Sequence, residues 1–368
     1  MRSLFYYILP LIRSRFSARA RLPWASWYSA MLRFCRSKVS IIAFIGIVIV
    51  LLFAVFAPAL SRWDYNDQDL NRINLPPKVP VLENYGILDG TRWLTNRRVD
   101  SLEDTSRYPE GSILKVINHR TVQGVEMCDI KVDYYKYSGV EDGTYFWMGT
   151  DYLGRELWVR MWRGTRVSLL IAFISVICNV CIGIVYGSIA GYYGGKVDMI
   201  MMRITEIIGA FPEIVVVTLF ILFFGTGILS IILCLVVQNW IGTARMIRSQ
   251  FYRYKGSEYV LAARTLGVRD MALIFRHILP NSIGPIITRA MIAIPGAIFT
   301  ESFLAYIGLG IRAPESSIGV LLSQGQKVMQ QYPNQVFFPA VVISLLMIAF
   351  NMLSNGLRDA FDPTQRGA

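Results

Sequence analysis

The chain has 368 residues, of which 54% are hydrophobic and only 17% are charged, and its mean hydropathy is +0.43. This composition excludes an ordinary soluble protein, because several apolar runs reach the roughly 20 residues that a helix needs to cross a bilayer. The net charge of +12 would suggest nucleic acid in a soluble chain, but membrane proteins gather Lys and Arg in cytoplasmic segments. We therefore predict a polytopic membrane protein, with membrane lipid as a partner and no nucleic-acid partner.

The distribution of charge predicts the topology. Residues 1–40 hold eight Lys/Arg and no acidic residue, and residues 245–276 hold seven Lys/Arg against two acidic residues. Residues 61–166 are nearly balanced, with fifteen basic and sixteen acidic residues. Because an excess of Lys/Arg marks the cytoplasmic side, the first two segments are predicted inside and the third outside.

The basic segment 1–40 carries aromatic residues that suit a cytoplasmic segment lying partly in the membrane interface, with a disordered tail as the alternative. The first crossing is predicted at 41–60. This apolar run is longer than the h-region of a signal peptide and starts later in the chain, so we interpret it as an uncleaved helix.

Residues 61–147 are too long for a simple loop and are predicted to form a small β-rich extracytoplasmic domain. Asp89-Gly90 is a typical hairpin-turn signal, and residues 113–117 and 129–135 alternate in polarity as strands do. Two hypotheses for this insertion stay open. Either it contacts a solute-binding protein, or it shields the mouth of a pore or decorates the protein without a specific partner.

Five further apolar runs predict five more crossings. They span 167–191, 207–224 with a kink near Pro212, 228–243, 283–309 and 337–353, and an external loop is predicted at 311–335. Six crossings place both termini in the cytoplasm, in agreement with the charge distribution. The predicted fold is thus an all-α polytopic membrane protein with six transmembrane helices and a small β-rich extracytoplasmic insertion.

A polar, basic segment at 250–282 interrupts the apolar runs and is predicted as two short helices with a break. Gly267 can take the left-handed conformation that often ends a helix, and Asp270 can accept hydrogen bonds from the free N–H groups of the next turn. Pro280 ends or kinks the second helix. Helical spacing predicts one apolar face on that helix, formed by Met271, Ile274, Phe275, Ile278 and Leu279.

This segment resembles the signature loop of ABC importer permeases. The residues that match the family pattern are Ala262, Ala263, Gly267, Leu279 and Pro280. Leu261 stands where the family often has Glu, and Glu258 lies one turn earlier on nearly the same face. The resemblance implies a coupling loop at 250–282, with Glu258 and Asp270 among its residues, that docks on a separate ATPase subunit. The alternative is a basic loop held by the anionic inner leaflet.

A second motif precedes the second crossing. The string Gly149-Thr150-Asp151-Tyr-Leu-Gly154-Arg155 resembles a motif of the dipeptide/oligopeptide/nickel permease subfamily, Gly-Thr-Asp-x-x-Gly-Arg-Asp, with Glu156 in place of the last Asp. Its glycines allow a tight turn, and Asp151 can bond its own backbone. Further strings of that subfamily follow in order. The resemblance implies its C-type permease subunit, with 148–363 as the transmembrane domain and 364–368 as a cytoplasmic tail.

No ATP site is predicted. Gly194-Gly195-Lys196 could suggest a phosphate loop, but Ala190 stands at the position of its first glycine and Val197 at that of the magnesium-binding Ser/Thr. The resemblance implies that ATP and Mg²⁺ bind to partner ATPase subunits, that this chain is not an enzyme and that it binds no cofactor. The two histidines lie far apart in the chain, so no metal site is predicted.

Three ionisable residues in the predicted crossings are candidates for the path or its gate: Glu213, Arg289 and Glu301. Ionisable groups at membrane depth usually pair with one another or line a water-filled path. Glu301 is the strongest single candidate, with a structural ion pair as an equal alternative. Among Arg203, Glu206 and Glu213, a pair at the cytoplasmic mouth is favoured over a contact with substrate.

The function that the resemblance implies is a permease subunit of an ATP-driven ABC importer in the bacterial inner membrane. It would form half of the translocation path for peptides or a related small solute. The implied partners are a second permease subunit, two ABC ATPase subunits and an extracytoplasmic solute-binding protein. The alternative from another class is a proton-coupled secondary transporter that uses Glu206, Glu213 and Glu301 as carriers, but no internal inverted repeat is evident.

Overall fold

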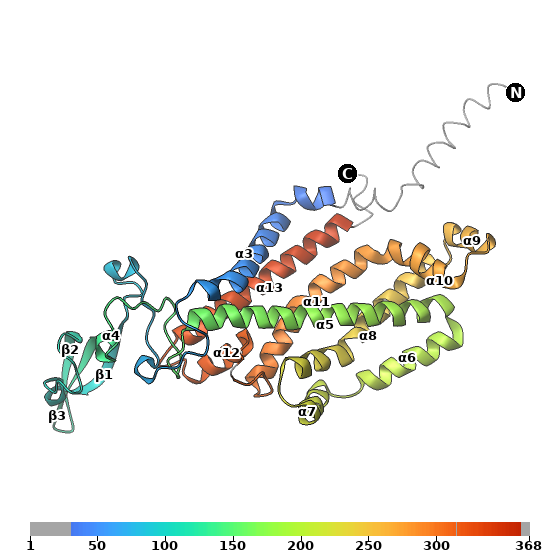
Figure 1. The fold of residues 1–368 in the computed structure, drawn as a ribbon. Helices are drawn as coiled ribbons and strands as arrows, with labels where there is room; N and C mark the ends of the chain where they lie inside the picture. Colours follow the sequence, from blue (N-terminus) through green and yellow to red (C-terminus); the bar gives the residue numbers. More distant parts are fainter. Residues whose placement is uncertain (1–30, 314, 362–368) are drawn as a thin grey trace.

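The structure is a computed structural model that describes residues 31–313 and 315–361. Most of the predicted basic segment 1–40 and the whole predicted tail 364–368 lie outside the described residues. The fold is an elongated bundle of helices, with a small sheet at one end and the 250–282 segment at the other (Figure 1). We call these the sheet end and the loop end.

Five helices of the described residues are long and apolar enough to cross a membrane. They are α3 (Lys38–Leu60), α5 (Leu157–Tyr193), α8 (Ile228–Tyr254), α11 (Ile283–Tyr306), which belongs to a span that begins at Asp270, and α13 (Asn334–Phe361). Each coincides with a predicted crossing. Helices α5, α8 and α13 extend well beyond the predictions, because hydropathy marks only the apolar part of a helix.

The third predicted crossing is a pair of helices and not one kinked helix. Helices α6 (Gly195–Gly209) and α7 (Glu213–Phe224) are bent by 77° at a short break. Pro212 is the N-cap residue of α7. Proline lacks an N–H group and disfavours a helical conformation at the residue before it, Phe211, so the helix stops. The described chain has six crossings if this pair is counted as one.

Glycines let α5 and α8 lie close together. Gly183, Gly187 and Gly191 recur every four residues on α5. A Cβ on Gly187 would lie 2.3 Å from the Ala244 carbonyl oxygen, and one on Gly191 would lie 2.6 Å from the Phe251 Cβ. Small residues at this spacing let helix backbones approach in a membrane, where van der Waals packing drives association. The α5–α8 pair is therefore tightly joined.

A hydrophobic cluster around Met161 and Phe350 joins α3, α5, α11 and α13. Helix α12 (Ile318–Lys327) enters this cluster through Ile318, which is fully buried. The predicted external loop 311–335 is therefore wrong in one respect, because it contains a packed helix. A short apolar run such as 318–322 does not by itself distinguish a buried helix from a strand.

The insertion 61–147 contains an antiparallel sheet of three strands in the order β1-β3-β2. The strands are β1 (Thr91–Arg98), β2 (Ile113–Val122) and β3 (Val125–Asp133). The predicted small β-rich insertion is confirmed, and β2 and β3 contain most of the two predicted strands. Strand β1 escapes prediction because its sequence is polar apart from Trp93 and Leu94.

The turn of the β-hairpin is Gln123-Gly124 and not the predicted Asp89-Gly90. Gln123 and Gly124 join β2 to β3, and their φ angles of +52° and +80° suit a type I′ turn. Asp89 precedes β1 and forms an isolated bridge with Lys78. The prediction chose Asp89-Gly90 because Asp-Gly is a stronger hairpin-turn signal in sequence than Gln-Gly.

One face of β3 forms the core of the insertion. Cys128, Ile130 and Val132 are buried there against Tyr108, and Cys128 is a free thiol. Short helical turns surround the sheet: η1 (Leu70–Arg72), η2 (Leu82–Tyr85), η3 (Val99–Leu102) and α4 (Tyr134–Tyr137).

Candidate functional site

The segment between α8 and α11 forms a helix, a break and a second helical stretch at the loop end (Figure 1). Its elements are α9 (Glu258–Thr265), α10 (Asp270–Ala272), the π-helix η4 (Leu273–Ile278) and the 3-10 turn η5 (Leu279–Ser282). Gly267 lies at the break with a φ of +80°, and its N–H donates to the Arg264 carbonyl at 3.0 Å. The predicted break is confirmed, and its left-handed conformation favours glycine.

A chain of hydrogen bonds fastens this segment to the end of α5. The Tyr192 hydroxyl donates to Asp270 Oδ1 at 2.5 Å, and Arg264 Nη2 donates to the Tyr192 hydroxyl at 3.2 Å. The predicted capping role of Asp270 is wrong, because Arg269 is the N-cap residue and no side-chain cap forms. The Asp270 carboxylate is bonded to α5 instead, so it joins two elements.

The buried face of the second stretch also differs from the prediction. Leu273, Ile274 and Ile278 are buried, whereas Met271 and Phe275 are exposed. The prediction assumed the 3.6-residue turn of an α-helix. In the π-helix the hydrogen bonds join residues five apart, so each turn is wider and the spacing of the buried face changes.

The segment exposes both apolar and basic side chains. We call this the loop surface, and its residues are Leu261, Arg264, Leu266, Arg269 and Met271. Leu266 is 84% exposed. The other predicted coupling residues lie around this surface: exposed Glu258 and Ala262, buried Ala263, and half-buried Leu279 and Pro280.

The Gly-Thr-Asp motif forms a buried ionic joint at the start of α5. Asp151 Oδ2 accepts a hydrogen bond from Arg155 Nε at 2.9 Å and another from Arg160 Nη1, and all three side chains are buried. Gly149 and Gly154 have φ angles of +80° and +73°. A Cβ on Gly154 would lie 2.0 Å from a backbone carbonyl oxygen of the insertion, so only glycine fits there.

Thr150 extends this joint to the insertion and to α13. Its hydroxyl accepts a hydrogen bond from the Leu75 N–H at 2.8 Å, and its carbonyl accepts one from Gln335 Nε2 at 3.2 Å. Asn334 Nδ2 donates to the Met148 carbonyl at 3.0 Å. The motif therefore holds the insertion, α5 and α13 together at the sheet end.

Glu301 is fully buried between α11, α5 and α12. Its carboxylate accepts hydrogen bonds from Ser168 Oγ at 3.0 Å and Ser317 Oγ at 2.5 Å. In the described ranges no basic side chain bonds to it, so the alternative of an ion pair within this chain is not seen, and its role in the path stays a prediction. Glu213 is exposed at the first turn of α7.

A cleft of about 260 Å³ lies between α5, α8 and α11. Its polar residues are Asn179, Asn239, Thr243, Arg289 and Thr300, and we call it the polar cleft. Small residues of α11, Ala293 and Gly296 among them, form much of its wall and leave it open. Of the three predicted path candidates, the polar cleft contains only Arg289.

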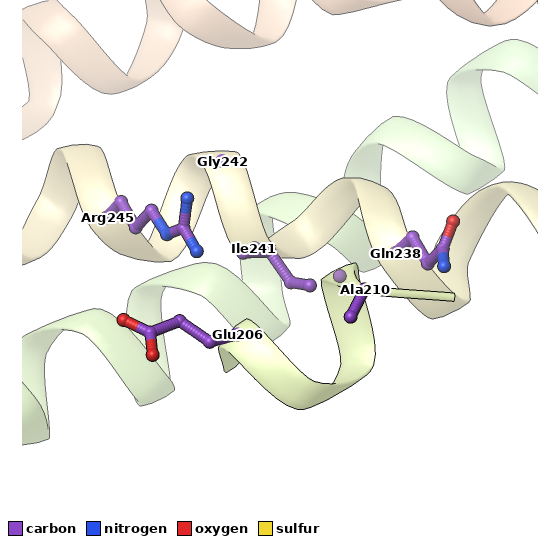
Figure 2. Close-up of a pocket in the computed structure, with 7 residues that line it drawn as sticks. Glu206, Ala210, Gln238, Ile241, Gly242 and Arg245 are labelled. Atoms are coloured by element: carbon purple, nitrogen blue, oxygen red, sulfur yellow. The ribbon is translucent and has the colours of Figure 1, made fainter. Parts of the chain in front are cut away.

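A second hollow, an open groove of about 440 Å³, lies between α6 and α8 beside the α6–α7 break. Figure 2 shows Glu206 on α6 and Arg245 on α8 along this groove. Glu206 pairs with Arg203 at 2.7 Å, as one of the predicted pairings. Gln238 Nε2 donates to the Phe211 carbonyl at 2.8 Å and thereby holds the break in place.

Hydrogen-bonding and charged side chains line both hollows. Within residues 31–313 and 315–361, no three His, Cys, Asp or Glu side chains cluster as metal ligands. The groove carries both signs of charge, whereas the polar cleft carries one cation and several neutral hydrogen-bonding groups. Such lining suits binding and passage of a polar solute.

Comparisons with known proteins show to which family the chain belongs. Residues 183–367 match the family model of the binding-protein-dependent transport system inner membrane component. Residues 26–77 match the N-terminal transmembrane domain of oligopeptide transport permease C. The chain belongs to this family of transport system inner membrane components. It is a multi-pass ABC importer permease, as its motifs imply.

The permease is similar to its relatives over most of its length. It is 35% identical over 340 residues to the oligopeptide transport system permease protein OppC of Bacillus subtilis (strain 168), covering 92% of this chain and 90% of that one. It is 36% identical over 336 residues to the dipeptide transport system permease protein DppC of Lactococcus lactis subsp. cremoris (strain MG1363), covering 90% and 88%. A chain of the inward-facing MetNI methionine ABC transporter superposes with a TM-score of 0.45 at 18% identity, over 55% of this chain and 96% of that one.

Several site residues of the permease escape prediction from sequence. Tyr192 and Arg160 become important only through contacts with residues far along the chain or on another face of the helix. Asn179 and Asn239 carry a signal that the prediction did not use, because each is a polar residue inside an apolar run. Polar side chains at membrane depth are costly and often functional.

Proposed function

We propose that this permease forms half of the translocation path of an ATP-driven importer of short peptides, and that a second permease subunit forms the other half. Its relatives are named as oligopeptide and dipeptide transport permeases, which supports peptides as the solute. A solute-binding protein delivers the peptide to the sheet end. The observation that carries the proposal is the segment α9–η5, which presents the loop surface at the opposite end.

The loop surface docks on an ABC ATPase subunit. Leu261, Leu266 and Met271 are exposed on this short segment, with exposed Arg264 and Arg269 between them in sequence, and exposed apolar surface of this kind marks interaction sites. The arginines favour water or an acidic partner surface over lipid. ATP and Mg²⁺ bind to the ATPase subunits, because this chain lacks the residues of a phosphate loop.

The loop end faces the cytoplasm and the sheet end faces outward. The Lys/Arg excess in 245–276 supports this orientation. The end of α13 lies beside the start of α11, because a Cβ on Gly284 would lie 3.1 Å from the Phe361 Cβ. The other end of the described chain lies there too, because Arg33 Nε donates to the Ala360 carbonyl at 3.0 Å. The termini are therefore cytoplasmic, 61–147 is the extracytoplasmic insertion, and 148–363 with coupling loop 250–282 is the transmembrane domain.

The segment α9–η5 transmits movement of the ATPase subunits to the translocation path. Tyr192 and Asp270 connect the loop to α5, and η5 leads directly into α11. Both helices border the polar cleft, and α5 is tightly joined to α8. A displacement of the loop therefore moves all three helices that form the cleft, in the manner of shear between packed helices.

The test is purification of the tagged permease from its own membranes in mild detergent, with co-purifying proteins identified by mass spectrometry. We expect two ABC ATPase subunits and a second permease. Leu266→Glu should reduce recovery of the ATPases and leave the second permease in place. Leu70→Glu is the matched control, because Leu70 is 75% exposed at the sheet end. A permease that purifies alone and still moves solute contradicts the proposal.

A further inference from the structure

The polar cleft contains an arginine that lacks a partner in the described part of the chain. Arg289 lines the cleft, and no hydrogen bond or ion pair to another described residue involves its guanidinium. Gly242 gives it room, since a Cβ there would lie 2.6 Å from Arg289 Nη2. A cation inside a membrane-crossing helix is costly unless water or an anion meets it. Arg289 is exposed, so water or an anionic group can reach its guanidinium.

An independent observation in the same cleft indicates a ligand with N–H groups. Asn179 is only 7% exposed, and its Oδ1 has no hydrogen-bond partner. Its Nδ2 donates to the Leu235 carbonyl at 3.4 Å. Asn239 Nδ2 donates to the same carbonyl at 2.7 Å, which leaves its own Oδ1 as a further acceptor. A buried acceptor is destabilising unless a donor meets it, so the Asn179 oxygen fits a donor from outside the chain, and Asn239, which is exposed, offers a second oxygen in the same cleft.

We propose that the polar cleft binds the carboxyl end of a short peptide in transit. Arg289 binds the carboxylate, and the amide oxygens of Asn179 and Asn239 accept hydrogen bonds from peptide N–H or ammonium groups. This inference rests on the proposed function and adds to it the chemical class of the solute, a peptide with a free carboxylate. The cleft, at about 260 Å³, is smaller than pockets that enclose a drug-sized ligand, so it takes one end of the peptide.

The geometry also explains why arginine suits this position. Its planar guanidinium can hold a carboxylate through two parallel hydrogen bonds, which gives direction as well as affinity. Lysine would supply the charge without the fork. The carboxylate also neutralises the cation during passage, which lowers the cost of both charges in the membrane.

The test compares two solutes in the importer reconstituted with all its subunits and its binding protein. One is a labelled short peptide with a free carboxylate, and the other is the same peptide with a carboxy-terminal amide. We expect Arg289→Gln to lower the ratio of free-acid to amide uptake by about tenfold or more, and Arg289→Lys to restore part of it. The binding protein is the same in every sample, so its own preference cancels. Arg312→Gln is the control, because Arg312 is exposed outside the cleft.

A second readout does not depend on delivery by the binding protein. Thr300→Cys places a thiol in the cleft lining, and mass spectrometry follows its modification. The free-acid peptide should protect this thiol, the amide should protect it less, and Arg289→Gln should abolish the difference.

Three results would overturn the inference. If Arg289→Gln lowers uptake of both peptides equally, Arg289 acts in packing or in an ion pair with the second permease subunit. If uptake of neither peptide falls, Arg289 takes no part in transport. Equal protection of the thiol by the free-acid peptide and the amide peptide would also overturn the inference. If the unaltered importer carries neither peptide in the presence of ATP, the proposed function itself fails, and that outcome is seen before any variant is compared.

Discussion

The Tyr192 hydroxyl donates a hydrogen bond to the Asp270 carboxylate at 2.5 Å, across 78 residues of sequence. Tyr192 lies in the last turn of α5, and Asp270 opens the second helical stretch of the 250–282 segment. Arg264 of α9 bonds to the same hydroxyl. One side chain of α5 therefore contacts both halves of the segment, on the two sides of Gly267.

Tyr192→Phe should weaken coupling while leaving the fold intact. The change removes a hydrogen bond to a charged group, which contributes about 1.5–3 kcal/mol, and keeps the ring. We expect fewer peptides imported per ATP hydrolysed, measured with the reconstituted complex. Tyr193→Phe is the matched control, since the same hydroxyl is lost from the neighbouring, exposed residue. Equal transport stoichiometry in the two variants would show that the contact carries no coupling.

Gly267→Val should disrupt the coupling segment. A β-branched residue at a φ of +80° is strained by about 1–2 kcal/mol or more, so the break between α9 and α10 will shift. We expect uptake to fall while ATP hydrolysis continues. Gly256→Val is the comparison, because Gly256 lies near the same segment, outside the left-handed region, with open space where a Cβ would be. Normal uptake by Gly267→Val at normal expression speaks against the assignment of this segment.

Asp151→Asn should destabilise the permease strongly. The substitution removes the charge that Arg155 and Arg160 share in a buried site, and breaking a buried ion pair costs about 3–5 kcal/mol. Thermal unfolding of the purified protein should shift to lower temperature. Asp142→Asn, on an exposed turn of the insertion, should leave the unfolding temperature nearly unchanged. Similar unfolding temperatures for both variants would contradict the joint described at the start of α5.

The sheet of the insertion should lose stability in acid. Hydrogen bonds from Asn118 Nδ2 and the Asn96 N–H, with the charge of Arg120, hold the pKa of Asp129 below its ordinary value. A lowered pKa in the folded state means that the carboxylate stabilises the fold above its unfolded pKa. That contribution is lost as the pH falls through the folded value.

Amide hydrogen exchange in the whole permease measures this loss. Between about pH 6 and about pH 3, β1, β2 and β3 should lose more protection in the unaltered chain than in Asp129→Asn. Dividing each amide exchange rate by that of an unstructured peptide at the same pH removes the intrinsic effect of pH on exchange. Parallel loss in both proteins would mean that other carboxylates control the acid response.

Prediction from sequence succeeded where one residue or one apolar run determines the structure. Gly267 marks its break because few residues adopt a positive φ, and α3 matches its predicted crossing because a bilayer requires about 20 apolar residues. Prediction failed where contacts with residues far along the chain determine the structure. Asp270 fits a capping role locally, but Tyr192 binds its carboxylate. The hydrogen bonds that Ser168 and Ser317 donate to Glu301 could not be predicted from sequence either, and the role of Glu301 in the path stays a prediction.

The break between α6 and α7 and the burial of α12 depend on tertiary packing as well. Pro212 predicts a disturbance of the helix but not a bend of 77°. The polar cleft needs three helices to meet, so no single stretch of sequence reveals it. Of the polar residues in the cleft, the sequence analysis singled out Arg289, because a charge inside an apolar run is rare.

The most direct test of the account is peptide uptake by the complete importer in sealed vesicles. We expect uptake that requires ATP and the binding protein and that continues when an uncoupler abolishes the proton gradient. Uptake that persists without ATP and stops with the uncoupler would contradict the account and favour a proton-coupled carrier.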